Sequence, residues 1–116
     1  MATLTTQTFD ESGATLSFDS AGGSGDKWAN NGNQQILIKN DSGAEVTLTV
    51  TTQVTTFESP EYGYSTKPNV TLIVPGSRSA IAGPFPVSAY NDVDGNCNIS
   101  YSATTSVEVA IFEINI

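Results

Sequence analysis

Apolar and polar residues alternate along most of the chain, and this period of two constrains the fold more than any other feature. Successive side chains of a β-strand point to opposite faces, so alternation is typical of a strand with one face in a core and the other in solvent. No window of ten or more residues keeps a helical period without interruption by Gly, Pro or β-branched runs. The sequence therefore predicts an all-β protein.

The clearest strand covers residues 45–54, where apolar residues alternate with threonine. Residues 34–39 alternate in the same way, and the turn-forming sequence Asn-Asp-Ser-Gly at 40–43 lies between the two segments. We predict that these two strands form a hairpin. Further strands, each bounded by Gly, Pro, Asn or Asp, are expected at residues 3–9, 14–18, 70–74, 77–82, 87–90, 96–102 and 106–114.

These strands are short, and turn residues recur about every 8–12 positions, which is typical of a sandwich, a jelly roll or a small barrel and not of a parallel α/β sheet. A chain of 116 residues has room for one core. We predict a single domain over residues 1–116, an antiparallel two-sheet β-sandwich of jelly-roll or immunoglobulin-like type with eight or nine strands, an N-terminal arm at 1–12 and an apolar tail at 112–116. The expected core consists of Trp28, Val46, Leu48, Val50, Val70, Leu72, Phe85, Cys97, Ile99, Tyr101, Val107 and Val109.

Charge and composition exclude several classes of function. Twelve acidic residues against four basic ones give a net charge of −8, so nucleic acid and anionic membranes repel the chain. There is no histidine for imidazole catalysis, and Cys97 alone cannot form an intrachain disulfide or a multi-cysteine metal site. The chain shows no secretory signal pattern and no apolar run near the ~20 residues of a membrane span. We expect a soluble protein, made in a reducing cytosol, without cofactors.

Paired carboxylates are the remaining catalytic option, because glycosidases use two of them without histidine. Asp92 and Asp94, like Glu58 and Glu61, lie in turns where acidic residues are common. Glu108 and Glu113 have opposite parity and fall on opposite faces of one strand. The sequence therefore favours a protein that is not an enzyme.

Residues 91–96, Asn-Asp-Val-Asp-Gly-Asn, resemble the start of a calcium loop. Counted from Asp92, however, the glycine comes at the fourth position instead of the sixth, and Ala103 stands where the helix-loop-helix pattern has glutamate. We interpret the segment as a hairpin turn, and binding of a surface cation by Asp92 and Asp94 is left open.

Two parts of the chain carry more apolar side chains than one small sandwich needs. The first is the long connection 55–69, and the second is the C-terminus, where the alternation of residues 107–111 changes parity at residue 112. A β-bulge, burial on both faces, or contact with another chain each explains this change. The candidate capsid or subunit interface residues are Phe57, Tyr62, Tyr64, Phe112, Ile114 and Ile116.

Three blocks of sequence carry a resemblance: GDKWANNGNQQILIKN at 25–40, VPGSRSAIAGPFPVSAYNDVDGN at 74–96 and NISYSATTSVEVA at 98–110. Together they resemble a family of small β proteins that decorate, or cement, the heads of tailed bacteriophages. The similarity covers roughly the last three quarters of the chain, and its most specific parts run from Asn30 to Asn40 and from Gly83 to Asn96.

The resemblance implies a structural virion protein, made in the host bacterial cytoplasm, that binds the outer surface of the head and clamps neighbouring major capsid subunits. It implies no catalytic residue and no cofactor. The expected partners are the major capsid protein and further copies of the chain, with a homotrimer favoured and a dimer second. The alternative is a carbohydrate- or receptor-binding β module of a virion, with Trp28, Tyr62, Tyr64 and Tyr90 as stacking surfaces.

Overall fold

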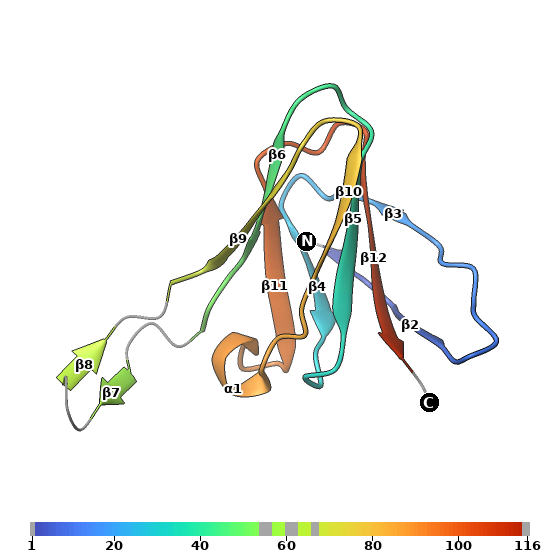
Figure 1. Cartoon of the computed structure of the whole chain (residues 1–116). Helices are drawn as coiled ribbons and strands as arrows, with labels where there is room; N and C mark the ends of the chain where they lie inside the picture. Colours follow the sequence, from blue (N-terminus) through green and yellow to red (C-terminus); the bar gives the residue numbers. More distant parts are fainter. Residues whose placement is uncertain (1, 54–56, 60–62, 66–67, 115–116) are drawn as a thin grey trace.

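Two five-stranded sheets pack face to face, which confirms the predicted all-β sandwich (Figure 1). The computed structural model of the protein describes residues 2–53, 57–59, 63–65 and 68–114, with no side chains described for 57–59 and 63–65. In order across the sheet, sheet 1 contains β1 (Ala2–Thr3), β4 (Asp26–Ala29), β11 (Asn96–Tyr101), β6 (Val46–Val50) and β9 (Val70–Val74). Sheet 2 contains β10 (Arg78–Ala82), β5 (Gln35–Asn40), β12 (Val107–Ile114) and β2 (Thr6–Phe9), and β3 (Asp19–Ser20) also pairs with β12.

Four antiparallel strand pairs are nested about the centre of the chain. β4 pairs with β11, β5 with β10, β6 with β9, and β7 (Phe57–Ser59) with β8 (Gly63–Ser65). Successive pairs along this two-stranded ribbon fall alternately in sheet 1 and sheet 2, and β7–β8 forms a small sheet of its own. A rolled, nested ribbon is the jelly-roll arrangement, one of the two types that the sequence left open.

The N-terminal segment makes the sheets mixed instead of purely antiparallel, so that part of the prediction was wrong. β1 runs parallel to β4, and β2 runs parallel to β12. Between β1 and β2 the chain passes from the edge of sheet 1 to the edge of sheet 2, and the side chain of Leu4 is buried there. Residues 2–9 of the expected arm are thus part of the sandwich.

The predicted hairpin of residues 34–39 and 45–54 was also wrong, because β5 and β6 lie in different sheets. Residues 41–45 carry the chain across one end of the sandwich. Asn40, which is fully buried, holds this crossing: its Nδ2 donates to the carbonyl oxygen of Ala44 (2.8 Å) and to that of Val74 (3.1 Å). A tight turn and a crossing between sheets use the same residue types, so the local signal did not separate them.

Two further strand predictions differ from the structure. Residues 87–90 form the short helix α1 (Val87–Tyr90) because Pro86 begins a helical turn, in which the Tyr90 amide donates to the Pro86 carbonyl at 3.1 Å. Residues 14–18 form no strand, and the strand that follows them, β3, pairs with β12 at residues 19–20. Residues 19–33, where the sequence predicted no strand, contain β4. Its alternation is not visible in the sequence because one of its two buried residues is the charged Asp26.

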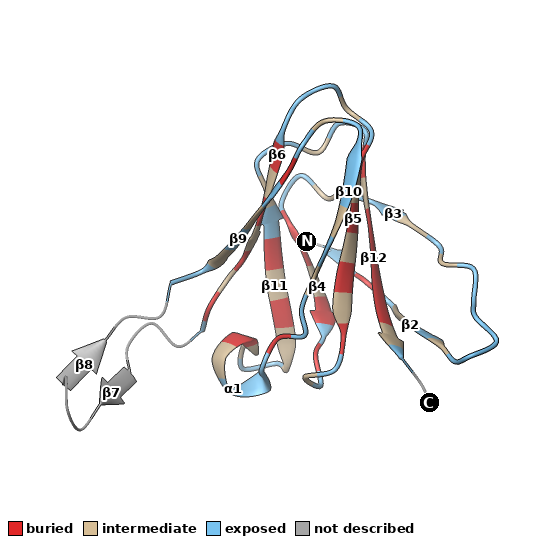
Figure 2. Cartoon of the chain, in the orientation of Figure 1, coloured by how far each residue is buried: buried red, intermediate tan, exposed pale blue. Residues whose placement is uncertain are grey.

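The predicted core is otherwise confirmed, and Figure 2 shows the buried residues on the strands that line the space between the sheets. Val70, Leu72 and Tyr101 are half-buried and pack against it. The fully or nearly fully buried residues of the prediction are Trp28, Val46, Leu48, Val50, Phe85, Cys97, Ile99, Val107 and Val109.

Candidate binding surface

The outer face of sheet 2 carries a line of apolar side chains that crosses its strands. Leu37 alternates with the buried Ile36 and Ile38, so its side chain lies on the outer face. Across the ladders, Leu37 is opposite Ile81 of β10 and Ala110 of β12. We call the set the outer stripe: Phe9, Leu37, Ile81, Ala110, Phe112 and Ile114.

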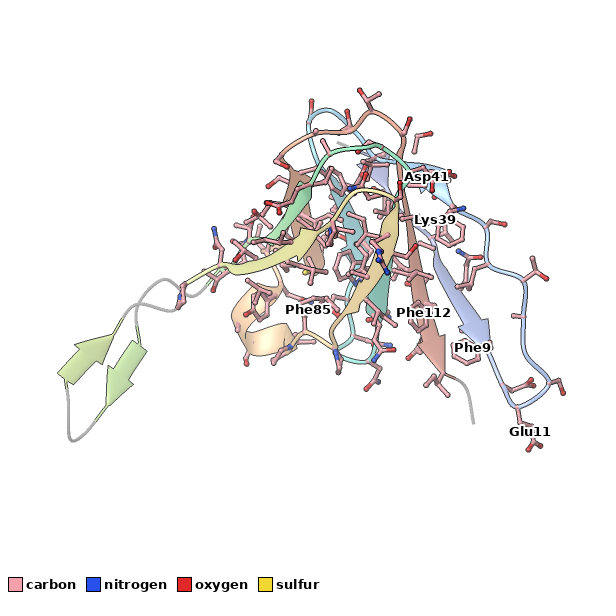
Figure 3. All side chains as sticks on the ribbon, turned by 45° about the horizontal axis from the view of Figure 1, so that its top comes forward. Phe9, Glu11, Lys39, Asp41, Phe85 and Phe112 are labelled. Carbon is pink, nitrogen blue, oxygen red and sulfur yellow. The ribbon has the colours of Figure 1, made fainter. Side chains whose placement is uncertain are left out.

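The part of the outer stripe formed by Phe9, Phe112 and Ile114 explains the change of parity at the C-terminus. β12 pairs with β5 in continuous register from Val107 to Phe112, so there is no bulge in this part of the strand. Phe112 instead packs on the outer face against Phe9, with ring centroids 5.8 Å apart (Figure 3). The strand is therefore buried on both faces, one of the explanations that the sequence allowed.

Two members of the outer stripe remain open to solvent. Ile81 is 54% exposed and Ile114, which lies opposite Phe9, is 52% exposed. Phe112, by contrast, is only 6% exposed. Its ring packs against Phe9 and offers little area to a partner. Ile81 and Ile114 are therefore the side chains of the outer stripe with the most area to offer a partner.

Polar side chains border the outer stripe on the side of residue 108. Lys39 lies opposite Glu108 of β12 and Ser79 of β10. Its Nζ lies 5.0 Å from the ring centroid of Phe18, a cation–π contact that attaches the segment before β3 to sheet 2. On this side the outer stripe thus ends at charged residues, which are common at the rim of an interface.

The other candidate interface residues are outside the described side chains. Phe57 lies in β7 and Tyr64 in β8, but their side chains are not described. Tyr62 and Ile116 lie outside the described residues altogether. These four residues remain predictions.

Two of the aromatic residues considered for sugar stacking are buried. Trp28 is 0% exposed and packs against Phe85, and Tyr90 is 3% exposed and contacts the same phenylalanine edge-on at 5.5 Å. A sugar ring stacks on an exposed aromatic face, which neither side chain offers. Both residues therefore serve the core.

The acidic segment 91–96 is a turn, as interpreted from the sequence. Asp92 accepts hydrogen bonds from the backbone amides of Asp94 (2.9 Å) and Asn96 (3.0 Å) and from Nδ2 of Asn98 (2.9 Å). These bonds, that of Asn98 foremost, lower the pKa of the Asp92 carboxyl. Within the described parts of the chain, no three His, Cys, Asp or Glu residues are grouped so that they could hold a metal ion.

The two most specific segments of the resemblance, residues 30–40 and 83–96, are hydrogen-bonded to each other at one end of the sandwich. Nδ2 of Asn30 donates to the carbonyl oxygen of Phe85 (3.0 Å) and to Oδ1 of Asn91 (2.8 Å), and Nδ2 of Asn91 donates back to the Asn30 carbonyl (2.8 Å). Gly83 has φ +112°, and a Cβ there would lie 3.0 Å from the carbonyl oxygen of Gln34. The motif residues thus have structural roles.

A buried acidic contact was missed by the sequence analysis. The Tyr101 hydroxyl donates to Oδ2 of Asp26 at 2.6 Å, and the Gly22 amide donates to the same oxygen at 3.0 Å. Burial, together with the hydrogen bond to Asp26, raises the pKa of the Tyr101 phenol. The sequence contained one indication of this contact: Asp26 and Trp28 are two residues apart, so in a strand both side chains lie on the same inward face.

No protein-family model, curated protein or solved structure matches the chain. The described residues form no helix long and apolar enough to cross a membrane.

Proposed function

We propose that the protein is a non-enzymatic structural protein of a phage virion, which binds the outer surface of the head and clamps neighbouring major capsid subunits. The observation that carries this proposal is the outer stripe, a row of apolar side chains across one sheet face with Ile81 and Ile114 each about half exposed. The resemblance of three sequence blocks to head decoration proteins supports the choice of partner.

The energetics suit a protein that acts only on an assembled lattice. Burying the exposed half of an isoleucine side chain contributes about 1 kcal/mol, so one outer stripe binds weakly by itself. A repeated surface multiplies such contacts through effective concentration, especially when copies of the chain are joined. The net charge of −8 keeps free copies soluble until the assembled site is present.

The alternative, a carbohydrate- or receptor-binding module, has less support. Trp28 and Tyr90 are buried, which leaves Tyr62 and Tyr64 as its stacking candidates. Glycan binding by the wild-type chain, together with failure to bind heads, would favour this alternative.

Co-sedimentation with heads tests the proposal. The chain is mixed with expanded heads of the phage whose genome encodes it and, separately, with isolated capsid subunits. We expect much stronger binding to heads, because only the assembled lattice presents the complete site. The proposal is wrong if wild-type protein remains in the supernatant at micromolar concentration.

Paired variants test the outer stripe itself. Ile81→Lys and Ile114→Lys each place a charge in the stripe, and we expect both to weaken binding to heads. Val93→Lys is the matched control, because Val93 is fully exposed in the turn 91–96 and lies outside the stripe. Equal binding by all three variants would exclude the outer stripe as the contact surface.

A further inference from the structure

The acidic residues are unevenly distributed along this acidic chain. None of the twelve lies in residues 62–91, whereas two of the four basic residues, Lys67 and Arg78, do. This acid-free segment contains β9 and β10, which residues 75–77 connect and which lie against each other at the junction of the two sheets. The edge strand β9 and the strand β10 that follows it therefore carry no carboxylate.

β9 is the edge strand of sheet 1 on that side (Figure 1). It pairs with β6, and its other edge pairs with no described strand. Beyond this ladder, the described residues make one hydrogen bond to the β9 backbone, from Nδ2 of Asn40 to the Val74 carbonyl. In an antiparallel edge strand, alternate residues direct their backbone N–H and C=O groups outward, so β9 presents a row of open donors and acceptors.

The sequence of β9 does nothing to block pairing with another strand. Natural edge strands are commonly protected by charges, proline, bulges or very short length. β9 has the sequence Val-Thr-Leu-Ile-Val, which is uncharged, free of proline and of high β-propensity, and Ile73 is 58% exposed. The opposite edge of sheet 1 is formed by β1, which has only two residues. Of the two edges of sheet 1, β9 is thus the better suited to receive a strand.

We propose that β9 pairs in antiparallel orientation with β9 of a second copy of this chain, forming a two-fold dimer with a continuous ten-stranded sheet. Val70, Leu72 and Val74 alternate with the outward Thr71 and Ile73. Only registers that pair residues of the same face align the two sheets. The register centred on Leu72 uses all five residues of β9 and places Thr71 opposite the partner's Ile73.

Charge favours a second copy as the occupant of this edge. Two chains of net charge −8 repel each other, and a contact made through acid-free segments keeps the carboxylates of both chains away from its centre. An isologous contact of this kind closes on itself, so it produces a dimer instead of the trimer favoured by the resemblance. The outer stripe lies on sheet 2 and remains free, so the dimer stands independently of the proposed capsid binding.

The test is the oligomeric state of the full chain, measured by sedimentation velocity at about 100 µM, where complexes with micromolar Kd values are populated. Two double variants of β9 differ only at residue 73, which is lysine in one and glutamate in the other. T71K/I73K places lysine opposite lysine twice in the proposed register, whereas T71K/I73E places each introduced lysine opposite an introduced glutamate of the other copy. Val93→Lys controls for an added surface charge, and far-UV circular dichroism confirms that each variant is folded.

We expect wild type, T71K/I73E and Val93→Lys to be dimers, and T71K/I73K to have a dimer Kd raised about tenfold or more. A wild-type monomer or trimer overturns the proposal. So does a T71K/I73K variant that dimerises as tightly as wild type. Loss of the dimer in both double variants rejects the register centred on Leu72 and, with it, the proposed pairing.

Discussion

Asn40 provides the sharpest test of how the chain crosses between the sheets. Its side chain is fully buried, and Nδ2 lies 2.8 Å from the carbonyl oxygen of Ala44, 3.1 Å from that of Val74 and 3.2 Å from that of Pro75. Oδ1 accepts from the amide and the hydroxyl of Ser42, at 3.1 and 2.6 Å. One carboxamide thus connects the end of β5, the crossing 41–45 and the end of β9.

Asn40→Ala removes these hydrogen bonds and leaves the carbonyl oxygen of the buried Val74 without its side-chain donor. A lost hydrogen bond costs about 1 kcal/mol and an unsatisfied buried group about 1–3 kcal/mol, so we expect a loss of about 2–4 kcal/mol in the free energy of unfolding. Asn40→Asp is expected to cost more at pH 7, because it directs a carboxylate oxygen at the three carbonyl oxygens.

The pH dependence of Asn40→Asp follows from the same geometry. Burial against carbonyl oxygens raises the pKa of the introduced carboxyl in the folded protein above its unfolded value of about 3.9. A raised folded pKa contributes stability below the unfolded pKa that is lost as pH rises through the folded pKa. The free energy of unfolding of the variant should therefore be close to that of wild type in acid. The difference from wild type should grow as the pH rises toward neutral.

Urea unfolding of both variants and wild type between about pH 3 and pH 8 measures these differences. Asn33→Asp is the matched control, since Asn33 is exposed and the chemical change is identical. The reasoning would be refuted if Asn40→Ala cost less than about 0.5 kcal/mol, or if Asn40→Asp and Asn33→Asp had the same stability at every pH.

Three further predictions concern the core, the acidic turn and the thiol. Leu48→Ala should lower the free energy of unfolding by about 2–5 kcal/mol, because Leu48 is fully buried; a loss below about 0.5 kcal/mol in urea unfolding would contradict the assigned core face. Calcium or a chelator should leave Tm unchanged, because Asp92 already accepts three hydrogen bonds; a rise of several degrees with calcium would instead make Asp92 and Asp94 ligands. Cys97 should resist thiol reagents in the native protein at pH 8 and react after unfolding, because burial raises its pKa to about 12; rapid native labelling would refute this.

Local patterns were sufficient for much of the fold. Alternation predicted β9 with its observed bounds, and β5, β6, β10, β11 and β12 to within a few residues. The same pattern predicted the buried faces of β6, of β11 and of residues 107–109, where inward and outward residues differ in polarity. At the candidate surface, the change of parity at Phe112 correctly marked a strand with apolar residues on both faces.

Local patterns failed where a residue's role depends on a distant neighbour. Asp26 looked like a loop residue because its partner, the Tyr101 hydroxyl, lies 75 positions away in sequence. Phe112 looked available to another chain because nothing in its own segment indicates that Phe9 covers it. Residues 87–90 alternate like a strand, but Pro86 and the packing of Tyr90 on Phe85 favour a helical turn.

The sequence by itself determined that this chain forms short strands with one apolar face and that its acidic residues avoid positions 62–91. These are properties of neighbouring residues, and they need no knowledge of the partner strand. Only the tertiary structure decided that β5 and β6 separate into different sheets, that the N-terminal strands pair in parallel, and that β9 is the edge of sheet 1 among the described strands. Strand pairing joins residues far apart in the chain, and the choice among pairings depends on how whole buried faces fit together and not on any single segment.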